Sequence, residues 1–422
     1  MEKNKRILIV TATLFVIAAL SIGSYYLFST RDNGGVAQNI MRNFFPSAIP
    51  KQESDTTVNT AGGQGTDNAI FETEEGSEEQ ITLRKISASP VAGAVIVENG
   101  GRAIVRYIER ETGHVFDVAT SSPEVARVTN TTILRVRDAL WSADGLHVAL
   151  QYLNEDLETV ETFLATVTIG NASSEGELQG VFLPENIVSL AVNNVGTEFV
   201  YVEKLNEGAR GVRVNTSGKH VAQIFSSPFF EWRVSYRQNG DISLLSKPSA
   251  NVSGFFYAVT AGGVFDRLLG DTAGLTALES PSKSYIAFSR SEGGKVAFSA
   301  IDETTGTISE LSLSTFPEKC VWSANDSDIL FCFVPNNFPS AVYPDSWYQG
   351  LVSFNDTLWK IDLKTETYEK LLDLEAITHE SLDGIKPSIS QNDSILIFTN
   401  KKDSSLWSIA LPKEQQEVED VS

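Results

Sequence analysis

The stretch Trp141-Ser-Ala-Asp-Gly-Leu-His-Val-Ala-Leu150 places a tight turn between two short apolar runs. A second clear copy is Trp322-Ser-Ala-Asn-Asp-Ser-Asp-Ile-Leu-Phe331, and five fainter copies bring the number of units to seven. Their turns fall at residues 93, 145, 196, 240, 283, 326 and 393, with gaps of 52, 51, 44, 43, 43 and 67 residues. Repeats of this length indicate supersecondary units that bury their apolar faces against one another.

Each unit has the pattern of paired β-strands. Apolar residues alternate or form short runs, and Asp144-Gly145 and Asn239-Gly240 are typical of hairpin turns. Third strands are expected at 114–118, 357–363 and 405–411, and an outer strand at 368–372. A propeller blade has four strands in about 40 to 50 residues. The sequence therefore predicts an all-β, seven-bladed β-propeller over residues 81–413, although six or eight blades would also fit the irregular gaps.

The two ends of the repeated region are complementary. The last unit supplies three strands, ends at Leu411 and lacks an outer strand, whereas residues 81–86 form a spare strand before the first unit. Pairing the two would complete the seventh blade and remove two open sheet edges, which otherwise promote aggregation. We therefore expect residues 81–86 to close the ring.

The turn motif of Trp141 to Leu150 resembles the W-S-x-D-G-x-x-[IVL]-[AL]-[FYL] repeat of TolB-like and WD40-like propellers. The resemblance covers residues 81–411 as a repeat pattern, and the Trp is replaced in five copies. It implies that one face of the disc binds a protein or peptide without catalysis. It identifies no partner.

The N-terminus contains a long apolar run. Residues 7–28 are 22 positions without a charged side chain, and a helix of this length spans about 33 Å, enough to cross a bilayer core. Lys3, Lys5 and Arg6 precede the run, so the N-terminus is expected in the cytoplasm and the propeller outside it. We predict a membrane anchor over residues 1–29. The alternative is a cleaved signal peptide, which would also export the domain.

Residues 30–80 are expected to form a flexible acidic linker. A short amphipathic helix over residues 36–45 would lie on the membrane surface and end at Pro46. The stretch from Lys51 to Gly76 is polar and rich in glycine, which does not bury enough apolar surface to become ordered. Residues 414–422 are expected to be an acidic tail.

Composition narrows the function. The chain has 54 acidic and 33 basic residues and a net charge of −21, which disfavours nucleic acid as a partner. The sequence has no G-x-S-x-G elbow and no Gly-rich phosphate loop. Its four His form no H-x-x-x-H pair and no Cys/His cluster. We expect no catalytic residues, no metal and no cofactor.

The sixth gap is about 20 residues longer than the repeat period requires, and it contains an aromatic insertion over residues 334–354. Long loops in compact domains are usually functional or disordered. Its aromatic rings would present flat faces to a glycan or a peptide, or alternatively would fold back over the end of the central channel. The candidate ligand-binding residues are Tyr343, Asp345, Trp347 and Tyr348.

Cys320 and Cys332 flank the hairpin centred on Asp326, so they are expected to face each other on adjacent strands. Opposed residues have Cβ atoms near the disulfide range, and an exported domain permits oxidation. The sequence thus suggests a disulfide. The alternative is two small buried apolar side chains.

These features favour a single-pass, extracytoplasmic propeller that acts as a non-enzymatic protein- or glycan-binding scaffold at the cell envelope. Its expected partners are the membrane, through residues 7–28, and an envelope protein or glycan. One alternative is a glycan-active hydrolase or lyase that uses channel carboxylates, such as Asp138 with Asp144 or Asp345 with Asp356. Another is a structural component that self-associates.

Overall fold

The computed structural model describes residues 70–72, 81–99, 102–154, 159–170, 175–237 and 240–412. The predicted membrane anchor, the helix expected over residues 36–45 and the acidic tail lie outside these residues. Within the described ranges, no helix has the length and apolar character needed to cross a bilayer.

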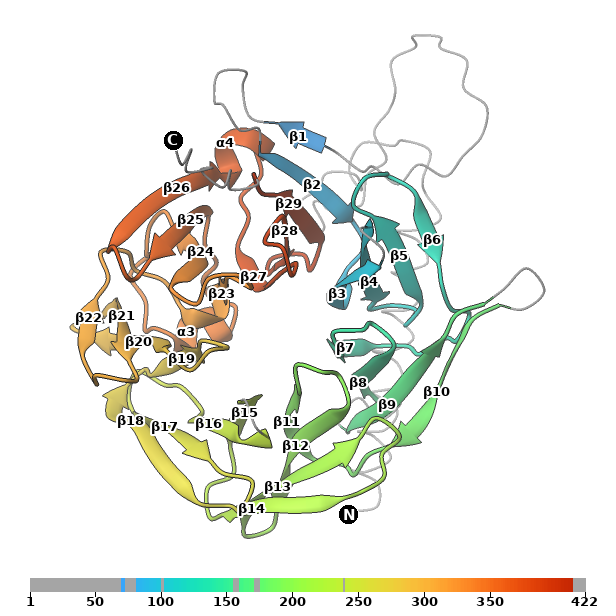
Figure 1. Cartoon of the computed structure of the whole chain (residues 1–422), viewed down its shortest axis with the longest axis horizontal. Helices are drawn as coiled ribbons and strands as arrows, with labels where there is room; N and C mark the ends of the chain where they lie inside the picture. The colour runs from blue at the N-terminus through green and yellow to red at the C-terminus, as the bar shows by residue number, and fades with distance from the viewer. Residues whose placement is uncertain are drawn as a thin grey trace, which may run out of the picture. The chain divides into compact units, whose positions relative to one another are not determined.

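Seven antiparallel sheets are arranged around a centre (Figure 1), which confirms the predicted seven-bladed all-β propeller. Blades 1 to 6 each use four consecutive strands. Blade 1 contains β3 (Val91–Asn99), β4 (Arg102–Glu109), β5 (Val115–Ala119) and β6 (Val125–Arg127); blade 2 contains β7 (Val136–Trp141), β8 (His147–Leu153), β9 (Val160–Thr168) and β10 (Glu177–Phe182); and blade 3 contains β11 (Ile187–Val192), β12 (Glu198–Leu205), β13 (Gly208–Asn215) and β14 (Ala222–Ser227). Blade 4 contains β15 (Trp232–Tyr236), β16 (Ile242–Ser246), β17 (Ser253–Val259) and β18 (Phe265–Ala273); blade 5 contains β19 (Thr276–Glu279), β20 (Tyr285–Glu292), β21 (Lys295–Asp302) and β22 (Ile308–Glu310); and blade 6 contains β23 (Cys320–Trp322), β24 (Ile329–Pro335), β25 (Asp356–Asp362) and β26 (Thr367–Asp373). In the described part of the chain, short helices join strands at η2 (Pro317–Lys319), α3 (Asp345–Tyr348) and α4 (Leu374–Thr378).

Blade 7 combines both ends of the repeated region. It contains β27 (Gly384–Ile389), β28 (Ile395–Asn400) and β29 (Leu406–Ala410), and β2 (Thr82–Ser87) pairs with β29 as the outer strand. The register places Leu83 opposite Ile409. The predicted closure of the ring is therefore confirmed.

The expectation that all of residues 30–80 form a linker is wrong at one place. Residues Ile70–Glu72 form strand β1, which pairs antiparallel with β2 and places Ile70 opposite Arg84. The apolar pair Ile70-Phe71 interrupts the acidic composition here, and the outer edge of β2 offers unpaired backbone groups. This edge accounts for the extra strand.

The recurring motif has a structural role in the turn. Ser142 Oγ accepts a hydrogen bond from His147 N at 3.0 Å, and Asp144 Oδ1 accepts one from Leu146 N at 2.8 Å. Blade 7 repeats the first contact, because Ser390 Oγ accepts from Ile395 N at 2.9 Å. The turn positions 145, 196, 240, 283 and 393 all have a positive φ, which favours Gly, Asn or Asp.

The turn predicted at residue 93 is wrong. Gly93 lies within β3, where a Cβ atom would stand 2.0 Å from the carbonyl oxygen of Ala139 in β7. Glycine is needed here for the close approach of two blades, and the first hairpin falls instead between Asn99 and Arg102. This shift brings the first gap closer to the others.

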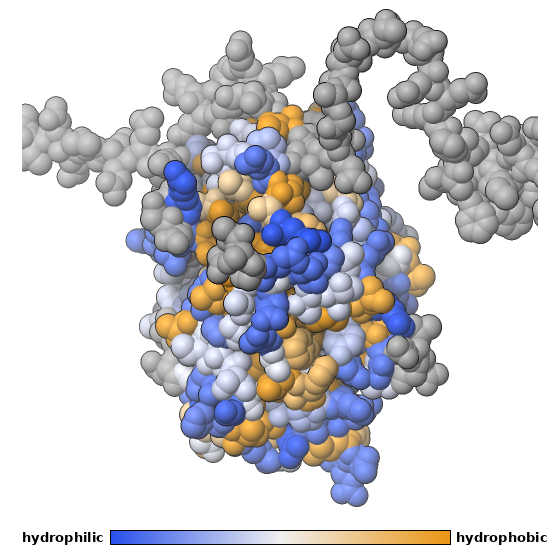
Figure 2. Space-filling model, turned by 90° about the vertical axis from the view of Figure 1, so that its right-hand side faces the viewer, coloured by the Kyte–Doolittle hydropathy of each residue, from blue (hydrophilic) through white to orange (hydrophobic). Residues whose placement is uncertain are grey.

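The core lies between neighbouring blades. Trp322 and Leu330 of blade 6 pack in one buried cluster with Ala287 and Phe298 of blade 5. The motif residue Trp141 donates its Nε1–H to the carbonyl of Gly93 in blade 1 at 3.2 Å. The outer side of blades 1 and 2 shows hydrophobic residues scattered among hydrophilic ones, without one continuous apolar band (Figure 2).

Candidate functional site

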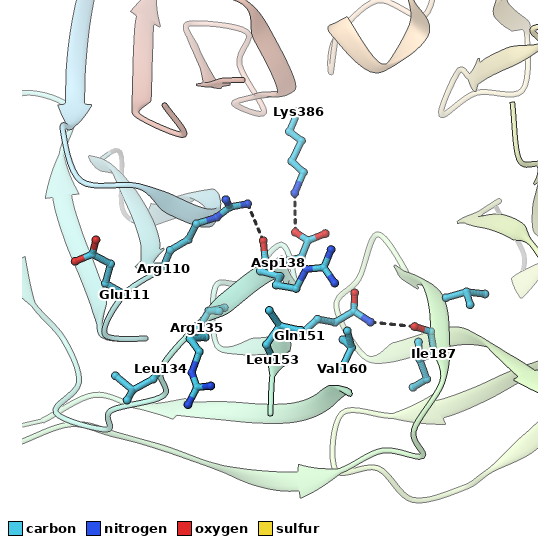
Figure 3. A pocket seen from close by; sticks show the side chains of 13 residues that line it. Arg110, Glu111, Leu134, Arg135, Asp138, Gln151, Leu153, Val160, Ile187 and Lys386 are labelled. Carbon is cyan, nitrogen blue, oxygen red and sulfur yellow. Dashed lines mark hydrogen bonds and ion pairs between the residues drawn. The ribbon is translucent and has the colours of Figure 1, made fainter. Parts of the chain in front are cut away.

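A cavity of about 900 Å³ opens on one face of the ring, around the start of β7 (Figure 3). Its walls come from the β4–β5 turn of blade 1, from β7, β8 and β9 of blade 2, from β11 of blade 3, and from β27 of blade 7. The site thus draws on four blades that are brought together only by the closed ring. Binding sites in proteins are usually concave and of this size.

The charge of the cavity is opposite to that of the chain. Its lining contains four basic and two acidic side chains, namely Arg110, Arg135, Arg137, Lys386, Glu111 and Asp138. The whole chain carries a net charge of −21, so the positive surplus is local. A concave site with a surplus of one sign of charge attracts ligands of the other sign.

Bulges in the innermost strands supply several lining residues. The register shifts between Val136 and Asp138 in β7, between Ile187 and Ser189 in β11, and between Ile385 and Ser388 in β27. The residues omitted from the ladders include Arg137, Val188 and Lys386, which all line the cavity. A bulge leaves its extra residue unpaired and redirects its side chain, so the backbone itself places two cations here.

Lys386 connects blade 7 to blade 2 across the cavity (Figure 3). Its Nζ lies 2.6 Å from Asp138 Oδ1, and the two side chains are 52% and 49% exposed. An exposed pair contributes only about 0 to 1 kcal/mol, so an incoming anion can replace Asp138 at small cost. Arg110 Nη2 donates to the carbonyl of Arg137 at 2.9 Å. The exposed Arg137 side chain makes no hydrogen bond or ion pair with the described residues, and remains available to a ligand.

The candidate residues of the insertion do not form the expected aromatic surface. Tyr343 is 3% exposed and Trp347 is 2% exposed. Trp347 stacks on Phe316, with ring centroids 4.9 Å apart, and the two rings lie in one buried cluster. The binding faces predicted for these two rings are therefore absent, because the rings pack inward.

The other two candidate residues connect the insertion to blade 4. Asp345 Oδ2 accepts a hydrogen bond from Ala250 N at 2.8 Å. The Tyr348 hydroxyl donates to Glu318, and the Arg233 guanidinium lies 4.6 Å from the Tyr348 ring centroid. Burial and the neighbouring Glu318 carboxylate raise the pKa of Tyr348 well above its usual value. The insertion, which belongs to blade 6, thus extends across the end of blade 5 and contacts blade 4.

The carboxylates considered for a glycosidase have separate partners. Asp144 holds the β7–β8 turn, and Asp138 pairs with Lys386. Asp345 accepts from Ala250, whereas Asp356 is fully buried beside Lys319. Among the described residues, no group of three or more His, Cys, Asp or Glu side chains is placed to hold a metal ion.

Cys320 and Cys332 are directly opposite in the β23–β24 pair and are joined by a disulfide, with a Cα–Cα distance of 4.1 Å. Both are buried in the cluster between blades 5 and 6. The bond links two strands that are already neighbours along the chain. Its contribution therefore comes from restricting the unfolded chain.

Replacement of both cysteines by alanine is expected to destabilise the domain by about 2 kcal/mol, because the unfolded chain loses its cross-link. Chemical denaturation of the two proteins measures the difference. A non-reducing peptide map should show residues 320 and 332 joined in the wild-type protein. Two free thiols would contradict both the bond and the destabilisation.

The sequence signals of the basic cavity were weak but present. Arg135 and Arg137 lie shortly before the clearest repeat motif, and Lys386-Pro387 places a proline within what the structure shows to be strand β27. Proline lacks an N–H group, so within a strand it is expected at an edge or a bulge. What the sequence does not show is that residues 137 and 386 meet, because this depends on closure of the ring.

No family model matches this chain, and no curated protein matches it in sequence. The structure is similar to the crystal structure of TolB from Acinetobacter baumannii, with a TM-score of 0.43 and 12% identity over 67% of this chain and 63% of that chain. It is also similar to hydrazine synthase of Kuenenia stuttgartiensis, with a TM-score of 0.47 and 9% identity over 76% of this chain and 95% of that chain. This chain thus spans less than two thirds of the TolB chain. The likeness concerns the fold alone.

Proposed function

We propose that this protein is a non-enzymatic binding scaffold whose ligand carries carboxylate groups and enters the basic cavity. The single observation that carries the proposal is the surplus of cations around a cavity of about 900 Å³ in a strongly acidic chain. Arg137 is exposed there and makes no ion pair with the described residues, and the partner of Lys386 is half-exposed. Guanidinium and ammonium groups bind carboxylates through charge-assisted hydrogen bonds.

We further propose that the scaffold acts at the cell envelope, anchored through residues 7–28 with the propeller outside the cytoplasm. The support is the uncharged run of 22 residues and the basic residues before it. The ligand would then belong to an envelope protein or to an acidic glycan. Protease treatment of intact cells tests the location, since a fully protected propeller contradicts it.

Charge reversal at the cavity is expected to weaken binding at least tenfold. The test uses the full chain in detergent, with labelled poly-L-glutamate as the peptide probe and polygalacturonate as the glycan probe. The double variant Arg137→Glu, Lys386→Glu replaces two donors by repulsive charges, and each lost charged hydrogen bond costs about 1.5 to 3 kcal/mol. Fluorescence anisotropy measures the affinity of each probe, which should fall as the salt concentration rises.

The matched control is Lys247→Glu, Arg267→Glu, which reverses the same number of charges at exposed positions of blade 4. It should bind like the wild-type protein. The preferred probe distinguishes a peptide ligand from a glycan ligand. Equal binding by the cavity variant, or no binding of either probe by the wild-type protein, would contradict the proposal. Shortening of polygalacturonate during the assay would favour the glycan-active enzyme instead.

A further inference from the structure

A lysine is completely buried between blades 6 and 7. Lys319 is the last residue of η2, and its side chain is 0% exposed, as are those of Asp356 and Asp383. Its Nζ lies 2.7 Å from Asp356 Oδ2, 2.5 Å from Asp383 Oδ1 and 3.0 Å from the carbonyl of Gly384. Lysine and aspartate are rarely buried to this degree, and burying such ions costs several kcal/mol each, by rough estimates.

Aromatic rings of the insertion exclude water from this cluster. The ring centroids of Trp347 and Phe354 lie 5.4 and 5.5 Å from Lys319 Nζ. Phe316 stacks against Trp347, and all three rings are buried. Because buried ions are costly where water is excluded, a reaction that converts the ammonium and the carboxylate into uncharged groups is favoured here.

Asp383 has the contacts expected of an electrophilic carboxyl group. Its Oδ1 faces Lys319, and its Oδ2 accepts hydrogen bonds from Trp347 Nε1 and from the Phe354 backbone N, both at 3.0 Å. Two fixed donors on one oxygen form the kind of arrangement that stabilises the negative charge of a tetrahedral intermediate. The Lys319 amine therefore lies beside a carboxyl group whose second oxygen is already held.

Asp356 can hold and transfer a proton. Its Oδ2 accepts from Lys319 Nζ and from Gly384 N, both at 2.7 Å, whereas its buried Oδ1 has no hydrogen-bond partner among the described residues. Burial raises the pKa of Asp356 to about 6, with Lys319 opposing the rise and Asp383 adding to it. A carboxyl group that titrates near neutral pH serves efficiently as acid and base in turn.

We propose that Lys319 and Asp383 form an intramolecular amide bond, with Asp356 as the proton carrier. The Nζ lone pair attacks Cγ of Asp383, and Oδ2 carries the developing charge. Asp356 takes two protons from Nζ in turn, one from the ammonium before the attack and one from the adduct after it, and delivers both to Oδ1, which departs as water when the carbon–oxygen bond breaks. Ammonium and carboxylate thus give one amide and one water, Asp356 is regenerated, and no oxidant or cofactor is needed.

This bond would add a covalent link that the proposed binding function does not require. Residues 319 and 383 are 64 positions apart, so the amide would join η2, which precedes blade 6, to the start of blade 7. The aromatic insertion then has a defined role, because Trp347 and Phe354 both shield Lys319 and donate to Asp383. The pair of Lys319 and Asp383 would thus be a site of covalent modification, and the insertion would protect this site rather than bind a ligand.

Peptide mapping of the wild-type full chain tests the proposal without any variant. After reduction and digestion, we expect one joined pair of peptides that contain residues 319 and 383, lighter than their sum by the mass of one water molecule. Trypsin should fail to cut after Lys319 but should cut after Lys401, a nearby lysine whose Nζ lies 5.5 Å from the Trp347 ring. Linear peptides with cleavage after Lys319 would overturn the proposal, and a link to Asp356 would overturn the assignment of the acceptor.

Variants separate the chemistry from a simple ion pair. Lys319→Arg keeps the charge but should give no joined peptide, whereas Lys401→Arg should give the wild-type amount. Asp356→Asn should keep the fold, judged by the intact Cys320–Cys332 disulfide and circular dichroism, and lose at least nine tenths of the joined peptide. Full linkage in a folded Asp356→Asn protein would overturn its role as proton carrier.

Discussion

Deletion of residues 82–87 from the full chain is expected to abolish cooperative unfolding of the propeller. Strand β2 buries Leu83 in the cluster between blades 6 and 7, and Ile86 in the cluster between blades 7 and 1. Each large apolar side chain contributes about 1.5 to 3 kcal/mol on burial, and each ladder hydrogen bond about 0.5 to 1.5 kcal/mol. Their sum is comparable with the whole stability of a typical domain, about 5 to 15 kcal/mol.

Thermal unfolding followed by circular dichroism measures this effect. Deletion of residues 31–69 serves as the control, since it leaves β1 and β2 in place, and it should leave the melting temperature unchanged. A milder variant, Leu83→Ala, should cost about 3 kcal/mol, whereas Ile308→Ala on the exposed outer strand β22 should cost little. If both deletions melted at the same temperature, β2 would not be the strand that closes the ring.

The fold was predictable because its signals are local and repeated. The hairpin turns require a residue with a positive φ, and glycines such as Gly145 and Gly196 indicate these positions in the sequence. The last unit ends at Leu411 without an outer strand, and residues 81–86 form an unassigned strand that could fill this place. The error at Gly93 has the opposite cause, because a glycine that permits close packing and a glycine that makes a turn look the same in sequence.

The sites were less predictable because they depend on contacts between distant blades. Nothing in the sequence shows that Lys386 meets Asp138, or that Lys319 meets Asp383. The insertion was recognisable by its length and its aromatic residues, but the direction of Trp347 was not. Phe316, which lies before the repeat unit of Trp322, supplies the surface on which Trp347 stacks. Inward packing of Trp347 is favoured because its ring stacks on Phe316 and its Nε1–H donates a hydrogen bond to Asp383.

A buried carboxylate at the junction of blades 4 and 5 makes stability depend on pH. Glu279, at the end of β19, is 9% exposed and lies 2.6 Å from Arg237 Nη2, which is also 3.1 Å from Glu303. Within the described residues, no donor makes a hydrogen bond of good geometry to either carboxylate oxygen of Glu279. Burial raises the pKa of Glu279 to about 7. The positive charge of Arg237 opposes this rise, and the negative charge of Glu303 adds to it. One arginine thus faces two acidic side chains in a place with little water.

The wild-type protein is expected to lose stability as the pH rises from about 4.5 to 8, relative to a Glu279→Gln variant. Between its ordinary pKa and the folded value of about 7, Glu279 binds a proton in the folded state but not in the unfolded chain, so the stabilisation present below pH 4.5 is lost as the pH rises through 7. The shift corresponds to about 3 kcal/mol. Urea denaturation at several pH values should therefore show the two proteins nearly equal at pH 4.5 and the Gln variant more stable at pH 8. Glu310→Gln, at an exposed position of the same blade, controls for the loss of one charge. A constant difference between wild type and Glu279→Gln across this range would mean that Glu279 is ionised throughout and that Arg237 compensates for its burial.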